Sequence, residues 1–286
     1  MKKSSLVFTV LLPLSGWAQT GSEIWLFDLN EKRGKLTASR PVNITNHPGY
    51  DNQPSFHPQK PIVYYASFNE QGRADIKSYN YKTKATTQIT ETNEREYSPK
   101  VTPDQAFISC IVQRDNGAQD LGKYPVDGGE AAVIVDHLTV GYHVWADNSH
   151  LALFVLGQPQ TLHFLRLPTK EDTVVASQIG RSLHRVPSER AISFVHKESE
   201  QQWRIKKFDT ESLKITTIAD ALPGREDITW TPNGVLLSSD GTKLFVLDGK
   251  TWKPLEVSSE SVALRGITRL AVSADGKKLA VVMSEE

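Results

Sequence analysis

The stretch SPKVTPDQAFISCIV, residues 98–112, joins a polar entry, a Pro-Asp turn and a strongly apolar strand. The pattern occurs five more times, as QPSFHPQKPIVYYAS from Gln53, YHVWADNSHLALFVL from Tyr142, SLHRVPSERAISFVH from Ser182, DITWTPNGVLLSS from Asp227 and ITRLAVSADGKKLAVVM from Ile267. The turn positions, Pro58, Pro103, Ala146, Pro187, Pro232 and Ala274, are 45, 43, 41, 45 and 42 residues apart. This period is typical of four-stranded propeller blades, and the short runs of Val, Ile, Phe and Tyr favour strands over helices. The sequence therefore predicts an all-β, six-bladed β-propeller of four-stranded antiparallel blades.

The two ends of the chain predict how the ring closes. After the sixth turn only one strong strand, Lys278–Met283, precedes the last residue. At the other end, Glu23–Asp28 has the pattern of a third strand, and Arg40–Thr45 that of a fourth. We expect N-terminal strands C and D to pair with C-terminal strands A and B in one blade, because an open ring would expose unpaired strand edges.

The first residues have the pattern of an export signal. Lys2 and Lys3 precede a short apolar segment from Leu6 to Leu14, and Gly16 and Ala18 are the small residues expected before a cleavage site. We predict a signal peptide at residues 1–18 and a single propeller domain at 19–286. The apolar segment is too short to span a bilayer, no later segment is long enough, and no Cys follows the signal to carry a lipid. The expected location is the periplasm or the outside of the cell.

Charge and cysteine content exclude several functions. The chain has 33 basic and 33 acidic residues and no basic tract, so nucleic-acid binding is not expected. Cys110 is the only cysteine, which rules out an intrachain disulfide. It lies in an apolar strand without an identifiable neighbouring base, so we expect it to fill core space.

The repeats resemble the WD-like propeller repeats of TolB-type periplasmic proteins. The matching elements are Ser98–Asp104, Ser273–Lys277 and the strand Asp75–Tyr79 that leads to Ile89-Thr90. The resemblance implies the propeller fold and, as in many relatives, a platform for protein interaction. TolB has an additional N-terminal domain with no counterpart in these repeats, so its specific role in the envelope is not implied.

The loops between successive repeats are the best candidates for a binding site. Four of the six carry an arginine at a similar place, and three carry a tyrosine. Arginine can hold an anionic group by bidentate hydrogen bonds, and tyrosine adds rigid contact area. The alternative is that these arginines pair with acidic residues of the same loops. The predicted binding residues are Tyr50, Asp51, Arg95, Glu96, Tyr97, Tyr142, His143, Arg181, His184, Arg225, Glu226, Asp227 and Arg265.

Motifs for catalysis or metal binding would favour a different function. The chain has no G-x-S-x-G elbow and no H-x-x-x-H spacing, and two channel histidines, His143 and His184, are too few to indicate a metal. We therefore expect no cofactor or metal and favour a non-enzymatic module that binds an envelope protein or peptide, an anionic small molecule or a sugar. The alternative is a carbohydrate-active or lactone-type hydrolase or lyase, with the channel carboxylates Asp51, Glu96, Glu226 and Asp227 as its candidates.

Overall fold

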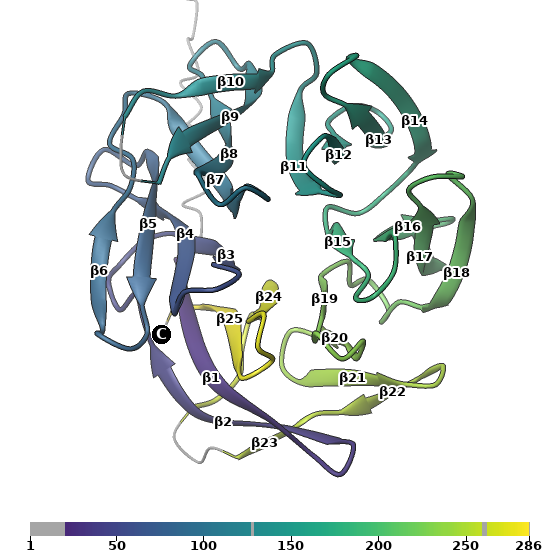
Figure 1. Cartoon of the computed structure of the whole chain (residues 1–286). Coiled ribbons are helices and arrows are strands. Elements are labelled where there is room, and N and C mark those ends of the chain that lie inside the picture. The colour runs from purple at the N-terminus through teal and green to yellow at the C-terminus, as the bar shows by residue number, and fades with distance from the viewer. Residues whose placement is uncertain (1–20, 127–128, 259–261, 286) are drawn as a thin grey trace, which may run out of the picture.

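The computed structural model describes residues 21–126, 129–258 and 262–285, which form a ring of six β-sheets around a central axis (Figure 1). The predicted signal peptide, residues 1–18, lies outside the described residues. Within them, no helix has the length and apolarity needed to cross a membrane. The predicted all-β, six-bladed propeller is confirmed.

Each blade is an antiparallel sheet whose strands A to D run from the axis outward. Blade I contains β3 (Asp51–Phe56), β4 (Ile62–Phe68), β5 (Ala74–Asn80) and β6 (Ala85–Gln88). Blade II contains β7 (Arg95–Val101), β8 (Phe107–Gln113), β9 (Gln119–Pro125) and β10 (Ala132–Val135). Blade III contains β11 (Val140–Trp145), β12 (His150–Val155), β13 (Thr161–Arg166) and β14 (Glu171–Ser177). Blade IV contains β15 (His184–Arg185), β16 (Ala191–Lys197), β17 (Trp203–Asp209) and β18 (Ile215–Asp220). Blade V contains β19 (Ile228–Trp230), β20 (Leu236–Ser239), β21 (Leu244–Asp248) and β22 (Thr251–Pro254).

Blade VI is built from both ends of the described chain. Its strands are β24 (Arg269–Val272), β25 (Lys278–Ser284), β1 (Ser22–Lys32) and β2 (Lys35–Asn43). β1 pairs with β25 from Ser22↔Ser284 to Asp28↔Lys278, so the N-terminal strands C and D adjoin the C-terminal strands A and B. Figure 1 shows the two ends of the colour scale meeting in this sheet.

Blade VI differs from the prediction in two details. The predicted fourth strand, Arg40–Thr45, is shifted, because Arg33 and Gly34 have positive φ and form a tight hairpin turn that lets β2 begin at Lys35. In addition, β23 (Glu256–Ser258) pairs in parallel with the outer edge of β2, so this blade has five strands instead of four.

Apolar side chains pack between neighbouring blades. The second strands are buried along most of their length because a blade stacks on each of their faces; the pattern is clear in β4, β8, β12, β16 and β25. Tyr64 and Ile76 of blade I, for example, share one cluster with Ile108 and Cys110 of blade II. Cys110 is free and fully buried, as predicted. This packing holds the inner strands in fixed positions around the axis.

The alternating strand directions give the ring two different faces. The connections from strand D to the next strand A, and the B–C hairpins, lie on one face, which we call the loop-side face. The A–B and C–D turns lie on the opposite face, which we call the turn-side face.

Candidate binding site in the central channel

Six side chains from one repeat position meet at the loop-side end of the channel. The position lies five residues before the turn anchor, and its occupants are Gln53, Ser98, Tyr142, Ser182, Asp227 and Arg269. In blade III the turn anchor is Asp147. The Ala146 N–H donates a hydrogen bond to His150 O, and the equivalent bond in blade V runs from the Thr231 N–H to Val235 O. Since Thr231 comes one residue before the anchor Pro232, Ala146 comes one residue before the anchor of blade III. The predicted anchor at Ala146 is therefore one residue too early. The six residues line a cavity of about 60 Å³.

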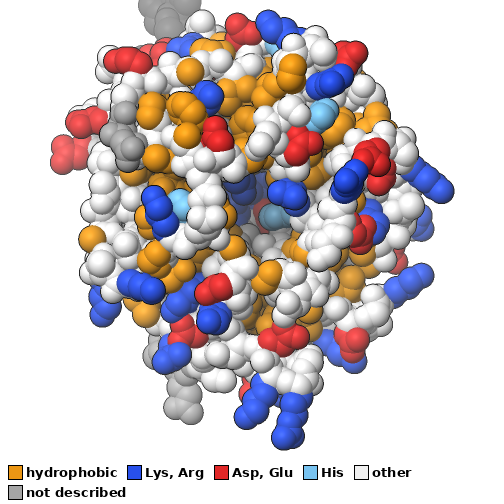
Figure 2. Space-filling view, viewed as in Figure 1, with side chains coloured by type: hydrophobic (Ala, Val, Ile, Leu, Met, Phe, Trp, Pro, Cys, Tyr) orange, Lys and Arg blue, Asp and Glu red, His pale blue; other side chains and the backbone are white. Residues whose placement is uncertain are grey.

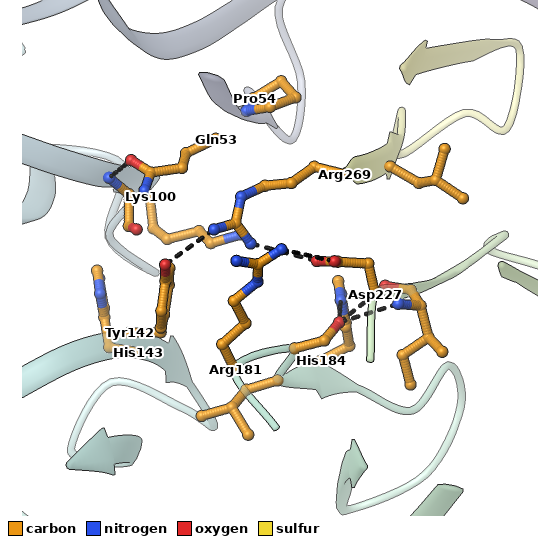
Figure 3. Close-up of a pocket in the computed structure, with 14 residues that line it drawn as sticks. Gln53, Pro54, Lys100, Tyr142, His143, Arg181, His184, Asp227 and Arg269 are labelled. Carbon is orange, nitrogen blue, oxygen red and sulfur yellow. Dashed lines mark hydrogen bonds and ion pairs between the residues drawn. The ribbon is translucent and has the colours of Figure 1, made fainter. Parts of the chain in front are cut away.

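Arg269 crosses this end of the channel. Its guanidinium donates to the Tyr142 hydroxyl at 2.8 Å, to Asp227 Oδ1 at 3.2 Å and to Asn52 Oδ1 at 3.1 Å. The guanidinium also lies 5.0 Å from the centre of the Tyr142 ring. Arg181 donates to the other oxygen of Asp227 at 2.8 Å. Figure 3 shows these side chains pointing toward one another from blades III, IV, V and VI. We call Tyr142, Arg181, Asp227 and Arg269 the crossbar.

Positive charge exceeds negative charge in the cavity lining. Lys100, Arg181 and Arg269 line it together with a single carboxylate, Asp227. Burial, followed by the charge of Arg269, lowers the pKa of Lys100 to about 8. Among the described residues, no hydrogen bond or ion pair reaches the Lys100 ammonium group. The arrangement can therefore accept an anionic group that brings the missing negative charge.

The two channel histidines are neutral at physiological pH. Burial, aided by the charge of Lys100, lowers the pKa of both His143 and His184 to about 3. His143 Nε2 lies 2.7 Å from Ser109 Oγ, and His184 Nε2 lies 3.0 Å from Ser182 Oγ. Both were predicted to face the channel, and both line the cavity. Within the described residues, no group of three or more His, Cys, Asp or Glu side chains could hold a metal ion.

The other predicted arginines lie away from the crossbar and are engaged elsewhere. Arg95 donates to Asp115 at 2.9 Å, and Arg225 donates to the backbone carbonyl of Asp240. Arg265 also has an interaction partner, and its backbone carbonyl accepts a hydrogen bond from the Ser284 N–H at 3.2 Å. Of the four loop arginines, Arg181 joins the channel lining and pairs with the acidic loop residues Glu226 and Asp227, as the pairing alternative describes. The role of the arginines in binding stays a prediction.

Four predicted residues of blades I and II are placed beside the channel and do not line its cavity. Tyr50, Asp51 and Glu96 are buried, and Tyr97 is half-buried with its ring 6.4 Å from that of Tyr50. His47 Nδ1 lies 3.4 Å from Asp51 Oδ2. Burial raises the pKa of the Asp51 carboxyl to about 6, although Ser67 and His47 lower it. The role of the four predicted residues in binding stays a prediction.

The four carboxylates named for a hydrolase or lyase do not meet in the channel. Glu96 is fully buried and accepts hydrogen bonds from Thr92 at 2.6 Å and Tyr124 at 3.0 Å. Glu226 is paired with Lys197 at 2.8 Å and with Arg181 at 3.3 Å. Burial raises the pKa of Glu226, but the hydrogen bond from Lys197 and the charge of Arg181 outweigh it, so the pKa is lowered. Only Asp227 lines the cavity, with both oxygens bonded to arginines.

Sequence reasoning missed Lys100, Arg269, Asn52 and Gln53. They lie in inner strands, whereas the predicted binding residues come mainly from the loops between repeats. The signal that could have found Arg269 and Gln53 is their shared offset from the turn anchor, because equal repeat positions lie at equal height around the axis. Lys100 lies two residues further along the inner strand, toward the turn-side face, and the equivalent residues of the other blades are Ser55, Val144, His184, Thr229 and Ala271.

Comparison with known proteins places the fold. No protein-family model matches the sequence, and no curated protein is similar to it in sequence. Solved structures are similar: a putative TolB from Agrobacterium tumefaciens aligns with a TM-score of 0.73 and 15% identity, over 94% of this chain and 99% of that chain. The fold is TolB-like.

Two further solved structures are similar in fold. An oligogalacturonate lyase in complex with manganese aligns with a TM-score of 0.58 and 15% identity, over 88% of this chain and 83% of that chain. A chain of the nidogen/laminin complex aligns with a TM-score of 0.64 and 12% identity, over 82% of this chain and 94% of that chain. At these identities the likeness establishes the fold alone, so function must be argued from the site.

Proposed function

We propose that the protein is an exported, non-enzymatic binding module of the cell envelope, whose loop-side face holds an acidic segment of a partner protein or peptide. The observation that carries this proposal is the crossbar. Hydrogen bonds from four blades fix its tyrosine and arginines before any partner arrives, which lowers the entropy lost on binding. Tyrosine and arginine are also the residue types that dominate interaction hot spots.

Charge and position support the same proposal. The cavity below the crossbar is lined by three cationic side chains and one carboxylate, so an acidic group is favoured there. The Arg181 side chain is 31% exposed, which leaves it accessible from the loop-side face while Asp227 orients it. The predicted signal peptide supports export to the compartment where an envelope partner would be met.

The test is an affinity pull-down from the native cell envelope with the mature chain as bait. A second bait carries Tyr142→Ala, Arg181→Ala and Arg225→Ala on the loop-side face. A matched control bait carries Tyr81→Ala, Arg166→Ala and Arg190→Ala, which lie at strand ends toward the turn-side face. We expect a protein captured by the native and control baits and lost with the loop-side bait. Capture that is equal with all three baits, or with none, contradicts the proposal.

A further inference from the structure

The channel continues beyond the crossbar and opens widely on the turn-side face. A second cavity, of about 530 Å³, shares Pro54, Lys100, Leu183, His184 and Leu270 with the small loop-side cavity. We call this second cavity the turn-side bowl. The loop-side end holds only about 60 Å³ and is crossed by Arg269. Figure 2 shows the hollow at the centre of the ring with Lys or Arg and His side chains inside it. A small molecule therefore has more room to approach Lys100 from the turn-side face.

The walls of the turn-side bowl are largely apolar. Six inner strands and their turns contribute Phe56, Val101, Val144, Trp145, Leu183, Trp230, Leu270 and Val272, together with Pro54, Pro58, Pro103, Pro187 and Pro232. Trp145 and Trp230 are half-buried, so part of each indole faces the open space. Contact with these surfaces favours a ligand whose body is apolar.

Most polar groups at the bowl are already bonded to the protein. The Thr102 and Ser273 hydroxyls are bonded to Asp104 and Asp275, and the Thr231 hydroxyl accepts from the Val235 N–H. The indole N–H groups of Trp145 and Trp230 donate to Ser109 and Ser193, each at 2.9 Å. A peptide would lose hydration of its amide groups here and gain few partners, which disfavours a polypeptide segment as the occupant.

Two cationic side chains line the bowl: Arg185, which is exposed, and Lys100 at its base. The Lys100 side chain is half-buried and lines both cavities, and among the described residues no carboxylate pairs with its ammonium group. The nearby His143 and His184 are neutral, so they supply no compensating charge. A cation held beside apolar walls favours a ligand with one anionic group at the end of an apolar body.

We propose that the turn-side bowl is a binding site for monocarboxylates with an apolar alkyl or aryl body, with the carboxylate on Lys100 and the body against Trp145 and Trp230. This inference goes beyond the proposed function: it concerns the opposite face of the ring and a small molecule instead of a macromolecular partner, although Lys100 lines the cavities of both.

The test is isothermal titration of the mature protein with decanoate, at neutral pH and below the concentration at which decanoate forms micelles. We expect one site per chain and binding weakened about tenfold or more in Lys100→Met, because a hydrogen bond to a charged group is lost. Lys100→Arg keeps the charge and retains binding. Lys253→Met, which removes an exposed lysine of the outer strand β22, binds as the native protein does. Decan-1-ol, with the same body and no charge, is expected to bind at least about tenfold more weakly.

Tryptophan fluorescence locates the body of the ligand. Trp145→Phe and Trp230→Phe should each remove part of the fluorescence change that decanoate causes, whereas Trp252→Phe, on outer strand β22, should leave that change intact.

Equal affinity for decanoate and decan-1-ol, or unchanged decanoate binding in a folded Lys100→Met variant, overturns the proposal. Binding of the free acid of a tri-leucine peptide without binding of decanoate also overturns it, since the occupant would then be a polypeptide end. The titration needs no protein partner, so its failure and the failure of the pull-down are distinguishable.

Discussion

Arg269 and Tyr142 belong to blades VI and III, which are opposite each other in the ring, yet the guanidinium donates to the phenol at 2.8 Å. The contact spans the channel and joins strands 127 residues apart in the sequence. It makes the loop-side end of the channel a rigid surface and leaves the turn-side end open.

Removing the Tyr142 hydroxyl tests how much the crossbar contributes to stability. Tyr142→Phe keeps the ring under Arg269 but leaves the guanidinium without one acceptor, so we expect a loss of about 1–2 kcal/mol in the free energy of unfolding. Urea denaturation followed by circular dichroism measures it. The control is Tyr81→Phe, because the Tyr81 hydroxyl has no hydrogen-bond partner within the described residues. Equal stability of the two variants would show that the hydrogen bond contributes nothing.

Asp227 neutralises two arginines, so its removal should unbalance the crossbar. We expect Asp227→Asn to cost about 2 kcal/mol, since Arg269 then loses its carboxylate partner in a partly buried site and Arg181 keeps only Glu226. Added sulfate should recover part of the loss in melting temperature by supplying negative charge to the two guanidinium groups. Differential scanning fluorimetry with and without sulfate measures both effects. Asp248→Asn, which breaks the exposed pair with Lys253, should show neither.

Asp51 should make the native protein less stable as the pH rises. Burial raises its folded pKa to about 6 from an ordinary value of 3.8, so the fold favours the protonated carboxyl. The resulting stabilisation is present below pH 3.8 and is lost as the pH rises through about 6, by up to about 3 kcal/mol. Asp51→Asn should therefore be more stable relative to the native protein at pH 7.5 than at pH 4. Urea midpoints at both pH values measure this, with the exposed Asp136→Asn as control. A difference that is the same at both values would refute the buried-carboxylate assignment.

Decanoate affinity should fall at alkaline pH. Burial and the charge of Arg269 lower the pKa of Lys100 to about 8, and the pKa values of His143 and His184 are lowered to about 3, so both histidines stay neutral between pH 7 and pH 9. The other charged groups of the two cavities are Arg181, Arg185, Arg269 and Asp227. Affinity should therefore be constant below pH 8 and fall by up to about tenfold per pH unit above it. Titrations in buffers of different ionisation enthalpy should show proton uptake above pH 8. A Lys100→Arg protein should have a flat profile over this range.

The repeat was enough to predict the fold because each blade carries the same alternation of turn and apolar strand. The strand β23 was not predictable, since Glu256–Ser258 is three residues long and is ordered by pairing with β2. The crossbar was predicted only in part. Tyr142, Arg181 and Asp227 lie in or next to the loops between repeats, whereas Arg269 lies inside a strand. Its reach to the opposite blade depends on the closed ring, which no local pattern encodes.

The sheet that joins the two chain ends also sets an order of events during folding. β1 cannot complete its pairing until β25 has been synthesised, so the apolar side chains of Ile24 and Leu26 lack their final partners until then. Such a long-range contact slows folding and leaves an exposed edge that other chains could join. Linking the ends near Ser22 and Ser284, and opening the chain between two other blades, would make every blade local in sequence. That permuted protein should fold faster and aggregate less while keeping the same ring.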